Sequence, residues 1–208
     1  LEAEGILEDT VVIYTSDQGM FLGEHDYQDK RWSFEESLRT PLLIRYPREI
    51  PAHTNCTELM ANIDIAPTLL DYAEISIPEN MQGISCRNMI AGKPQEEYHK
   101  GIYFRYWMHL AHQHDNPAHY GVRTKDYKLT FYYGLALDAE GAVDKPTQPG
   151  WELYDLQKDP GELKNVYEDP AYYEIREELK GLLCELKEKY QDQDEAYVEL
   201  QRTFEKYK

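Results

Sequence analysis

Two short apolar runs near the start of the chain constrain its fold most strongly: VVIYT at residues 11–15 and PLLIRYP at residues 41–47. Neither run alternates strictly between apolar and polar residues, which is typical of strands that are covered on both faces in a parallel α/β sheet. The apolar segment 62–72 predicts a helix, with Asp64 in its first turn and Pro67 near its start. We therefore predict an α/β portion with a partial parallel or mixed sheet.

The second half of the chain has a different character. Aromatic residues alternate with polar ones in the segments 101–108, 119–134 and 151–156, which indicates a small antiparallel sheet. Apolar residues then recur at helical spacing over 175–190, so a long amphipathic helix is expected to pack on that sheet. We predict an α/β domain over 1–98 and an α+β subdomain over 99–208. Because the first has too few strands for a complete doubly wound sheet, we expect a further segment upstream.

Charge and hydropathy argue against several classes of function. The chain has 39 acidic and 22 basic residues among its 208 and a net charge of −17, which disfavours nucleic acid and anionic membrane surfaces as partners. An anionic substrate would need a local cluster of cations. No apolar run is long enough for a membrane span. Source and localisation are not encoded in these features.

Cysteine content indicates neither a zinc site nor a disulfide framework. The three cysteines are widely spaced and form no CxxC pair, so at most one bridge is possible. Asn55-Cys56-Thr57 matches the pattern of a glycosylation acceptor, although an exposed loop is the simpler interpretation.

The segment between the two apolar runs carries polar side chains suited to chemistry. Asp17 and Gln18 follow the first run directly, and a carboxylate beside an amide oxygen provides hard ligands for Ca²⁺ or Mg²⁺. Both side chains reach one ion only if the chain bends, which Gly19 permits. Lys30 and His25 add an ammonium and an imidazole that can hold a tetrahedral oxyanion and protonate a leaving oxygen. A plain turn and solvent-facing side chains are the alternatives.

At this point the sequence resembles a known family. The run TSDQGMFLGEHDYQDKRWSFEESLRTPLLIRYP is similar to the second signature block of the type I sulfatases, which belong to the alkaline phosphatase superfamily. NIDIAPTLLDYA resembles the helix that follows this block, and WELYDLQKDPGELKNV resembles the closing strand and turn of the C-terminal subdomain. The resemblance implies the C-terminal part of an alkaline-phosphatase-like sulfatase fold.

The resemblance also implies roles for individual residues. Asp17 and Gln18 would be metal ligands, with Ca²⁺ as the usual ion and Mg²⁺ as a possible one. Lys30 and His25 would be catalytic and substrate-binding residues, Lys30 by neutralising the sulfate group and His25 at the edge of the substrate. Arg105 and His119 border the pocket and would also contact the substrate, with a structural role as the alternative. The substrate would be a sulfated small molecule or carbohydrate, and the family suggests a periplasmic or secreted setting.

One part of the family pattern is missing from this sequence. Sulfatases use a formylglycine made from a Cys/Ser-x-Pro/Ala-x-Arg motif, which none of the cysteines provides, and the Asp-Asp pair of the metal site is also absent. We expect the nucleophile in an upstream portion, so that this chain alone is inactive. Two alternatives remain open: a phosphodiester or phosphonate hydrolase of the same superfamily, and a non-catalytic module that binds anionic glycans or a protein. The aromatic stretch 103–120 is either a carbohydrate-facing wall or core.

Overall fold

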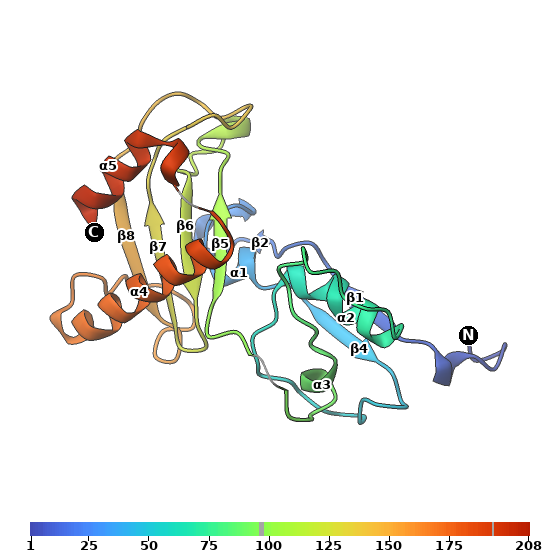
Figure 1. Cartoon of the computed structure of the whole chain (residues 1–208). Coiled ribbons are helices and arrows are strands. Elements are labelled where there is room, and N and C mark those ends of the chain that lie inside the picture. The colour runs from blue at the N-terminus through green and yellow to red at the C-terminus, as the bar shows by residue number, and fades with distance from the viewer. Residues whose placement is uncertain (96–97, 193) are drawn as a thin grey trace. The chain divides into compact units, whose positions relative to one another are not determined.

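The computed structural model describes residues 1–95, 98–192 and 194–208, which form two compact units (Figure 1). Unit 1 comprises residues 1–30 and 35–100, and unit 2 comprises residues 31–34 and 101–208. Within the described ranges, none of the helices combines the length and the apolar character that crossing a membrane requires.

Unit 1 is built from short elements joined by loops. They are η1 (Leu7–Asp9), β1 (Val12–Thr15), β2 (Phe21–Leu22), η2 (Glu24–Asp26), β3 (Gln28–Asp29), α1 (Glu35–Leu38), β4 (Leu42–Arg45), η3 (Asn62–Asp64), α2 (Ile65–Tyr72) and α3 (Arg87–Ile90). The two predicted apolar strands are present as β1 and β4, and the predicted helix over 62–72 is confirmed as η3 followed by α2. The proline, glycine and asparagine content of 76–100 predicts loops, and the described part of this range is loop apart from α3.

The pairing of β1 differs from the parallel arrangement that its sequence suggested. β1 and β4 form a two-stranded antiparallel sheet in which Val12 lies opposite Arg45, and no parallel pair occurs among the strands that the structure describes. Tyr14 and Leu43 are 65% and 68% exposed. An unbroken apolar run reports that a strand prefers cover on both faces, but it carries no information on the direction of its neighbour. In this chain the face that carries Tyr14 and Leu43 is uncovered, whereas the isoleucines of the other face are half-buried.

Polar contacts at a fully buried carboxylate hold the loops of unit 1. Asp64 accepts hydrogen bonds from the backbone N–H groups of Ala61 and Ile84, at 2.7 and 2.9 Å, and its Oδ2 lies 2.8 Å from Nε2 of His99. A buried carboxylate is tolerated only when such partners satisfy its oxygens. Asp64 therefore ties the start of α2 to two segments that follow it in the chain.

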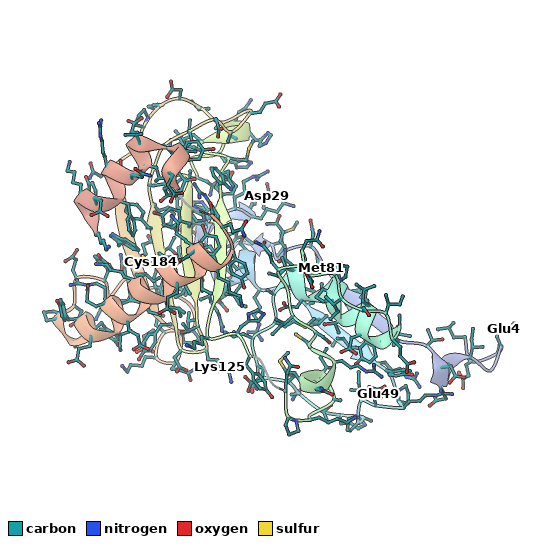
Figure 2. All side chains as sticks on the ribbon, viewed as in Figure 1. Glu4, Asp29, Glu49, Met81, Lys125 and Cys184 are labelled. Carbon is teal, nitrogen blue, oxygen red and sulfur yellow. The ribbon has the colours of Figure 1, made fainter. Side chains whose placement is uncertain are left out.

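A second polar cluster joins α2 to the loops on either side of it. Arg87 donates to both carboxylate oxygens of Glu49, which is labelled in Figure 2, and to Oδ1 of Asp71 at 3.2 Å. Its guanidinium also lies 5.1 Å from the centre of the Tyr72 ring. The planar guanidinium can serve several acceptors at once, which suits it to joining segments that have little apolar surface between them.

Unit 2 contains a four-stranded antiparallel sheet in the order β5-β6-β7-β8. Its elements are β5 (Ile102–Tyr106), η4 (Ala111–Gln113), β6 (His119–Arg123), β7 (Tyr127–Tyr132), β8 (Gly150–Asp155), η5 (Pro170–Tyr172), α4 (Tyr173–Lys189), η6 (Asp194–Ala196) and α5 (Val198–Tyr207). The predicted sheet and the predicted long helix are both confirmed. Figure 1 shows α4 lying across the strands.

One face of this sheet forms the main core. Leu129, Phe131 and Leu153 point to the side where Leu183 of α4 and Leu200 of α5 pack, and all of them are buried. The helix α5 was not predicted, because its apolar residues are few among charged ones in VELQRTFEKY. These apolar residues form a buried helix face only because Leu200 packs against the sheet in the folded chain.

The opposite face of the sheet is polar and yet buried. Lys128 and Thr130 alternate with the core residues of β7, so they project to this second face. Lys128 Nζ lies 2.5 Å from Glu162 Oε1, and both side chains are almost fully excluded from solvent. An ion pair in such surroundings is tolerated because each charge neutralises the other. That both faces of this sheet are covered could not be predicted from the residue pattern.

Candidate active site

Asp17 and Gln18 lie in the turn that directly follows β1, where the sequence placed them. Ser16 Oγ donates to Asp17 Oδ1 at 3.2 Å, and the backbone N–H of Gln18 donates to the same oxygen at 3.0 Å. These hydrogen bonds, with the positive charge of Lys30, lower the pKa of Asp17 below its ordinary value. The carboxylate is therefore ionised and exposed.

Gly19 is required in this turn for a reason that the sequence did not reveal. Its φ is not in the left-handed region; instead, a Cβ at this position would overlap the carbonyl oxygen of Glu36. The backbone N–H of Gly19 donates to the carbonyl of Ser37 at 2.9 Å. Only glycine lets the turn approach α1 this closely, so α1 is the support on which Asp17 and Gln18 are held.

His25 is presented by a small hairpin whose strands are β2 and β3. The ring of Phe21, buried in β2, contacts the His25 ring edge-on with the centroids 6.2 Å apart. His25 Nε2 lies 3.5 Å from Oε2 of Glu36. The same helix, α1, thus supports both the metal-ligand turn and the predicted substrate-contact histidine.

Lys30 follows β3 directly, on a backbone with unusual geometry. Its neighbours Asp29 and Arg31 have φ values of 73° and 96°, and His25 and Asp26 are also left-handed at 53° and 61°. Non-glycine residues adopt this conformation at a cost, and such residues cluster at functional sites. Lys30 forms no direct ion pair with Asp17, but its charge lowers the pKa of that carboxyl, so the two groups share one region of unit 1.

The donors present at this turn fit a hard divalent cation. Both hydrogen bonds to Asp17 end on Oδ1, and within the described part of the chain neither Oδ2 nor the Gln18 amide has a recorded hydrogen bond. A carboxylate oxygen and an amide oxygen are suitable ligands for Ca²⁺ or Mg²⁺. Among the described residues no group of three or more His, Cys, Asp or Glu side chains could hold a metal by itself. Asp17 and Gln18 can thus supply part of a metal site.

Arg105, predicted as a substrate contact, is engaged inside unit 2. Its side chain is 4% exposed and pairs with Asp192 Oδ1 at 2.5 Å and Asp194 Oδ1 at 3.6 Å. Its guanidinium lies 3.4 Å from the centre of the Trp107 ring. These contacts favour the structural alternative, and the substrate-binding role stays a prediction.

His119 is likewise enclosed by unit 2. It is 1% exposed, and its Nδ1 lies 2.8 Å from the carbonyl oxygen of Pro117. The rings of Tyr106 and Tyr132 flank it, with centroids at 5.4 and 4.9 Å. Burial lowers the pKa of His119 to about 4, so the imidazole is neutral near pH 7 and offers no charge to an anion. Its role as a substrate contact also stays a prediction.

The stretch 103–120 is mostly interior. His109 is fully buried and accepts from the backbone N–H of Ala118 at 3.0 Å, and Tyr120 belongs to the main core. The hydroxyl of Tyr103 donates to Asp192. These positions support the structural reading of the aromatic stretch.

Sequence reasoning missed residues that support the predicted site. Glu36, the partner of His25, lies in the run EES at the start of α1. Arg31 Nη1 lies 2.9 Å from His114 Nε2, a contact between residues far apart in the chain. The only feature of the sequence that could have pointed to Arg31 is that it is a basic residue next to Lys30. The spacing of residues along the chain does not indicate that Glu36 pairs with His25.

Comparison with known proteins identifies the family. The family model described as N-sulphoglucosamine sulphohydrolase, C-terminal, matches residues 23–189. The chain is similar to an N-acetylglucosamine-6-O-sulfatase of Bacteroides thetaiotaomicron, with 39% identity over 93% of this chain and 33% of the relative. The chain spans about a third of the length of the curated relatives it matches.

Solved structures with a similar fold support the same family assignment. One, in complex with its substrate D-glucosamine-2-N,6-O-disulfate, is 38% identical, has a TM-score of 0.83, and matches 95% of this chain and 38% of that chain. The phosphonate monoester hydrolase of Agrobacterium radiobacter shares the fold, with a TM-score of 0.69, 23% identity, and coverage of 90% of this chain and 36% of that chain. The chain belongs to the N-sulphoglucosamine sulphohydrolase C-terminal family, and its fold is that of the C-terminal part of the sulfatases it is similar to.

Proposed function

We propose that this chain is the C-terminal portion of an enzyme that hydrolyses sulfate esters on a sulfated carbohydrate, with an aminosugar as the preferred unit. The observation that carries the proposal is the turn held on α1, where the ionised, exposed carboxylate of Asp17 lies beside the Gln18 amide and within the electrostatic reach of Lys30. The aminosugar is inferred from the relative named N-acetylglucosamine-6-O-sulfatase and from the structure in complex with a disulfated glucosamine.

Each residue has a distinct task in this proposal. Asp17 and Gln18 hold a divalent cation, which we take to be Ca²⁺, with Mg²⁺ as the second choice. When bound, this ion polarises the sulfate oxygens as a Lewis acid. Lys30 binds the same group and offsets the negative charge that develops as the ester bond breaks. The imidazole of His25, oriented by Glu36, contacts the substrate edge. Because the chain carries a net charge of −17, these local cations are needed to attract an anion.

The nucleophile belongs to the upstream portion that we propose for the longer protein. No Cys/Ser-x-Pro/Ala-x-Arg motif occurs in these 208 residues, and the relatives are about three times as long. The remaining metal ligands would come from the same portion. The uncovered face of the β1–β4 pair, which carries Tyr14 and Leu43, supports this proposal, because apolar strand faces of this kind are usually covered in a complete sheet.

An assay on the longer gene product tests the proposal. We expect turnover of 6-O-sulfated N-acetylglucosamine and of 4-nitrophenyl sulfate, with none by the isolated chain. Lys30→Ala should lower kcat/KM by about 100- to 1,000-fold, the usual cost of losing one group that stabilises transition-state charge. Lys100→Ala, at an exposed lysine of the same unit, is the matched control and should leave kcat/KM unchanged. Turnover by the isolated chain would place the nucleophile within it and contradict the proposal.

Because the fold is shared with a phosphonate monoester hydrolase, hydrolysis of phosphonate or phosphate esters is the second candidate reaction. Parallel assays with 4-nitrophenyl sulfate, 4-nitrophenyl phosphate and a phenylphosphonate monoester separate the two. A preference for the phosphorus esters would favour the hydrolase of phosphonates or phosphodiesters. If the longer product lacks the formylglycine motif and turns over none of them, a module that binds anionic glycans or a protein becomes the better interpretation.

A further inference from the structure

The segment Arg31–Phe34 connects two parts of unit 1 but makes its own contacts within unit 2. The Trp32 ring lies against that of Tyr132, and the Phe34 ring against that of Tyr154, each with centroids 5.8 Å apart. Lys30 immediately precedes this segment and α1 immediately follows it. The segment is therefore an anchor placed between the predicted sulfate-binding lysine and the helix that supports the metal-ligand turn.

A chain of buried hydroxyl groups fixes the middle of this anchor. Ser33 is fully buried, Thr130 Oγ1 donates to Ser33 Oγ at 3.1 Å, and Ser33 Oγ lies 3.0 Å from the hydroxyl of Tyr132. Burial and the charge of Glu152 raise the pKa of Tyr132 well above its usual value, so the phenol stays protonated.

Both hydrogen bonds of Ser33 lead to β7. Thr130 donates to Ser33 Oγ, and Ser33 Oγ shares a second hydrogen bond with the Tyr132 hydroxyl, in which either oxygen can be the donor. Removing one member leaves its neighbour buried without a partner, which is costly.

The anchor lies close along the chain to a strained backbone. Asp29 and Arg31, on either side of Lys30, both adopt left-handed φ values, which persist only where surrounding contacts hold them. Arg31 is held by His114 at 2.9 Å, and Ser33 follows two positions later. Lys30 is three positions before Ser33, so its backbone is tethered within about 11 Å of that residue.

We propose that Ser33 is a positioning residue that holds Lys30 in place through its hydrogen bonds to the hydroxyls of Thr130 and Tyr132. This inference rests on the proposed function, because the anchor matters for catalysis only if Lys30 binds the sulfate group. Misplacement of a binding group by about 1 Å can cost up to ~100-fold in rate. We therefore expect Ser33→Ala to lower kcat/KM for 6-O-sulfated N-acetylglucosamine in the longer enzyme by about 10-fold.

A double-mutant cycle with Lys30 separates positioning from general stability. If Ser33 acts through Lys30, Ser33→Ala should change kcat/KM by less than about 2-fold once Lys30→Ala is present. Thr68→Ala is the matched control, since its hydroxyl is also buried and bonds to Asp64 O at 2.6 Å and Cys86 N at 2.9 Å. It should leave kcat/KM unchanged in both backgrounds. An equal loss from Ser33→Ala with and without Lys30 would overturn the proposal.

A second variant and a second measurement keep the two proposals distinguishable. Tyr132→Phe removes the next hydroxyl in the chain, and we expect the same loss in kcat/KM, not additive with Ser33→Ala. Amide hydrogen exchange on the 208-residue chain should be faster at residues 29–31 in both variants and unchanged there in Thr68→Ala. Unchanged exchange at 29–31 would overturn the anchor, whatever the enzyme does. An inactive wild-type longer enzyme with faster exchange in the variants would instead overturn the proposed function and leave the anchor supported.

Discussion

The two units differ in what holds them together. In unit 2, the apolar face of the β5–β8 sheet packs against α4 and α5 and forms a continuous core. In unit 1, Tyr14 of β1 and Leu43 of β4 are exposed, and polar contacts of Asp64 and Arg87 join its segments. The unit that carries the predicted chemistry thus has the smaller apolar core, and the main core belongs to unit 2.

A matched pair of leucine truncations tests this difference most strongly. Leu183→Ala in the unit 2 core should lower the free energy of unfolding by about 3–5 kcal/mol, because the side chain is fully buried and its loss leaves a cavity. Leu43→Ala in β4 should change it by less than about 0.5 kcal/mol in this chain, since that side chain is already exposed. Urea unfolding followed by circular dichroism measures both. Similar losses would contradict the assignment of the main core to unit 2.

The buried imidazole of His119 in unit 2 predicts that the stability of the chain depends on pH. Burial lowers the pKa of His119 from 6.5 to about 4, so below pH 6.5 the unfolded chain binds a proton that the folded chain does not. The contribution of the neutral His119 to the free energy of unfolding is fully present above pH 6.5. It falls as the pH drops from 6.5 to about 4, and it does not change further below pH 4. Its size is about 3 kcal/mol.

The measurement that tests this is the free energy of unfolding of the wild type and of His119→Asn, determined at several pH values between 4 and 6.5. Asparagine keeps a donor for the Pro117 carbonyl but has no titrating ring. The slope should disappear in His119→Asn and persist in His112→Asn, which alters an exposed histidine of the same unit. A slope that survives in His119→Asn would show that another group is responsible.

In unit 1, a single methyl group should disturb the predicted metal-ligand turn. In Gly19→Ala the new Cβ overlaps the carbonyl of Glu36, so either the turn or α1 must shift, at a cost of about 1–3 kcal/mol. Faster amide exchange at residues 17–19 and 35–38, together with weaker Ca²⁺ binding by the longer protein, would show this shift. Unaltered exchange in the variant would mean that the turn does not depend on close approach to α1.

The smallest expected effect is a gain of stability in unit 2. Gly181 lies within α4, is exposed, and has open space where a Cβ would be added. Gly181→Ala should stabilise the chain by about 0.5–1 kcal/mol, the difference in helix propensity. Thermal unfolding measures the change. The opposite signs for alanine at Gly19 and at Gly181 distinguish a glycine required by packing from one that is not.

Local pattern predicted much of this fold because the decisive interactions lie close together in the chain. The alternation in 119–134 and the helical spacing in 175–190 report directly on which face each residue buries. The direction of β1 could not be predicted in this way, since an unbroken apolar run is the same for parallel and antiparallel neighbours. The helix α5 escaped because Leu200 acquires its partners only in the folded chain.

In the candidate site, too, some features could be predicted from the local sequence and others could not. Asp17, Gln18 and Lys30 could be named from residue type, their order after a strand, and the family resemblance. The reason for Gly19, the pairing of His25 with Glu36, and the anchor at Ser33 depend on contacts between segments. For Arg105 and His119, sequence order placed them near the expected pocket, but burial and their partners within unit 2 could be seen only in the structure.

The most direct test is a crystal structure of the longer protein with Ca²⁺ and an unhydrolysed sulfate ester. We predict oxygen atoms of Asp17 and Gln18 at about 2.3–2.6 Å from the ion and the Lys30 ammonium within hydrogen-bond distance of a sulfate oxygen. An ion coordinated without these two residues, or a sulfate group beyond the reach of Lys30, would contradict the account.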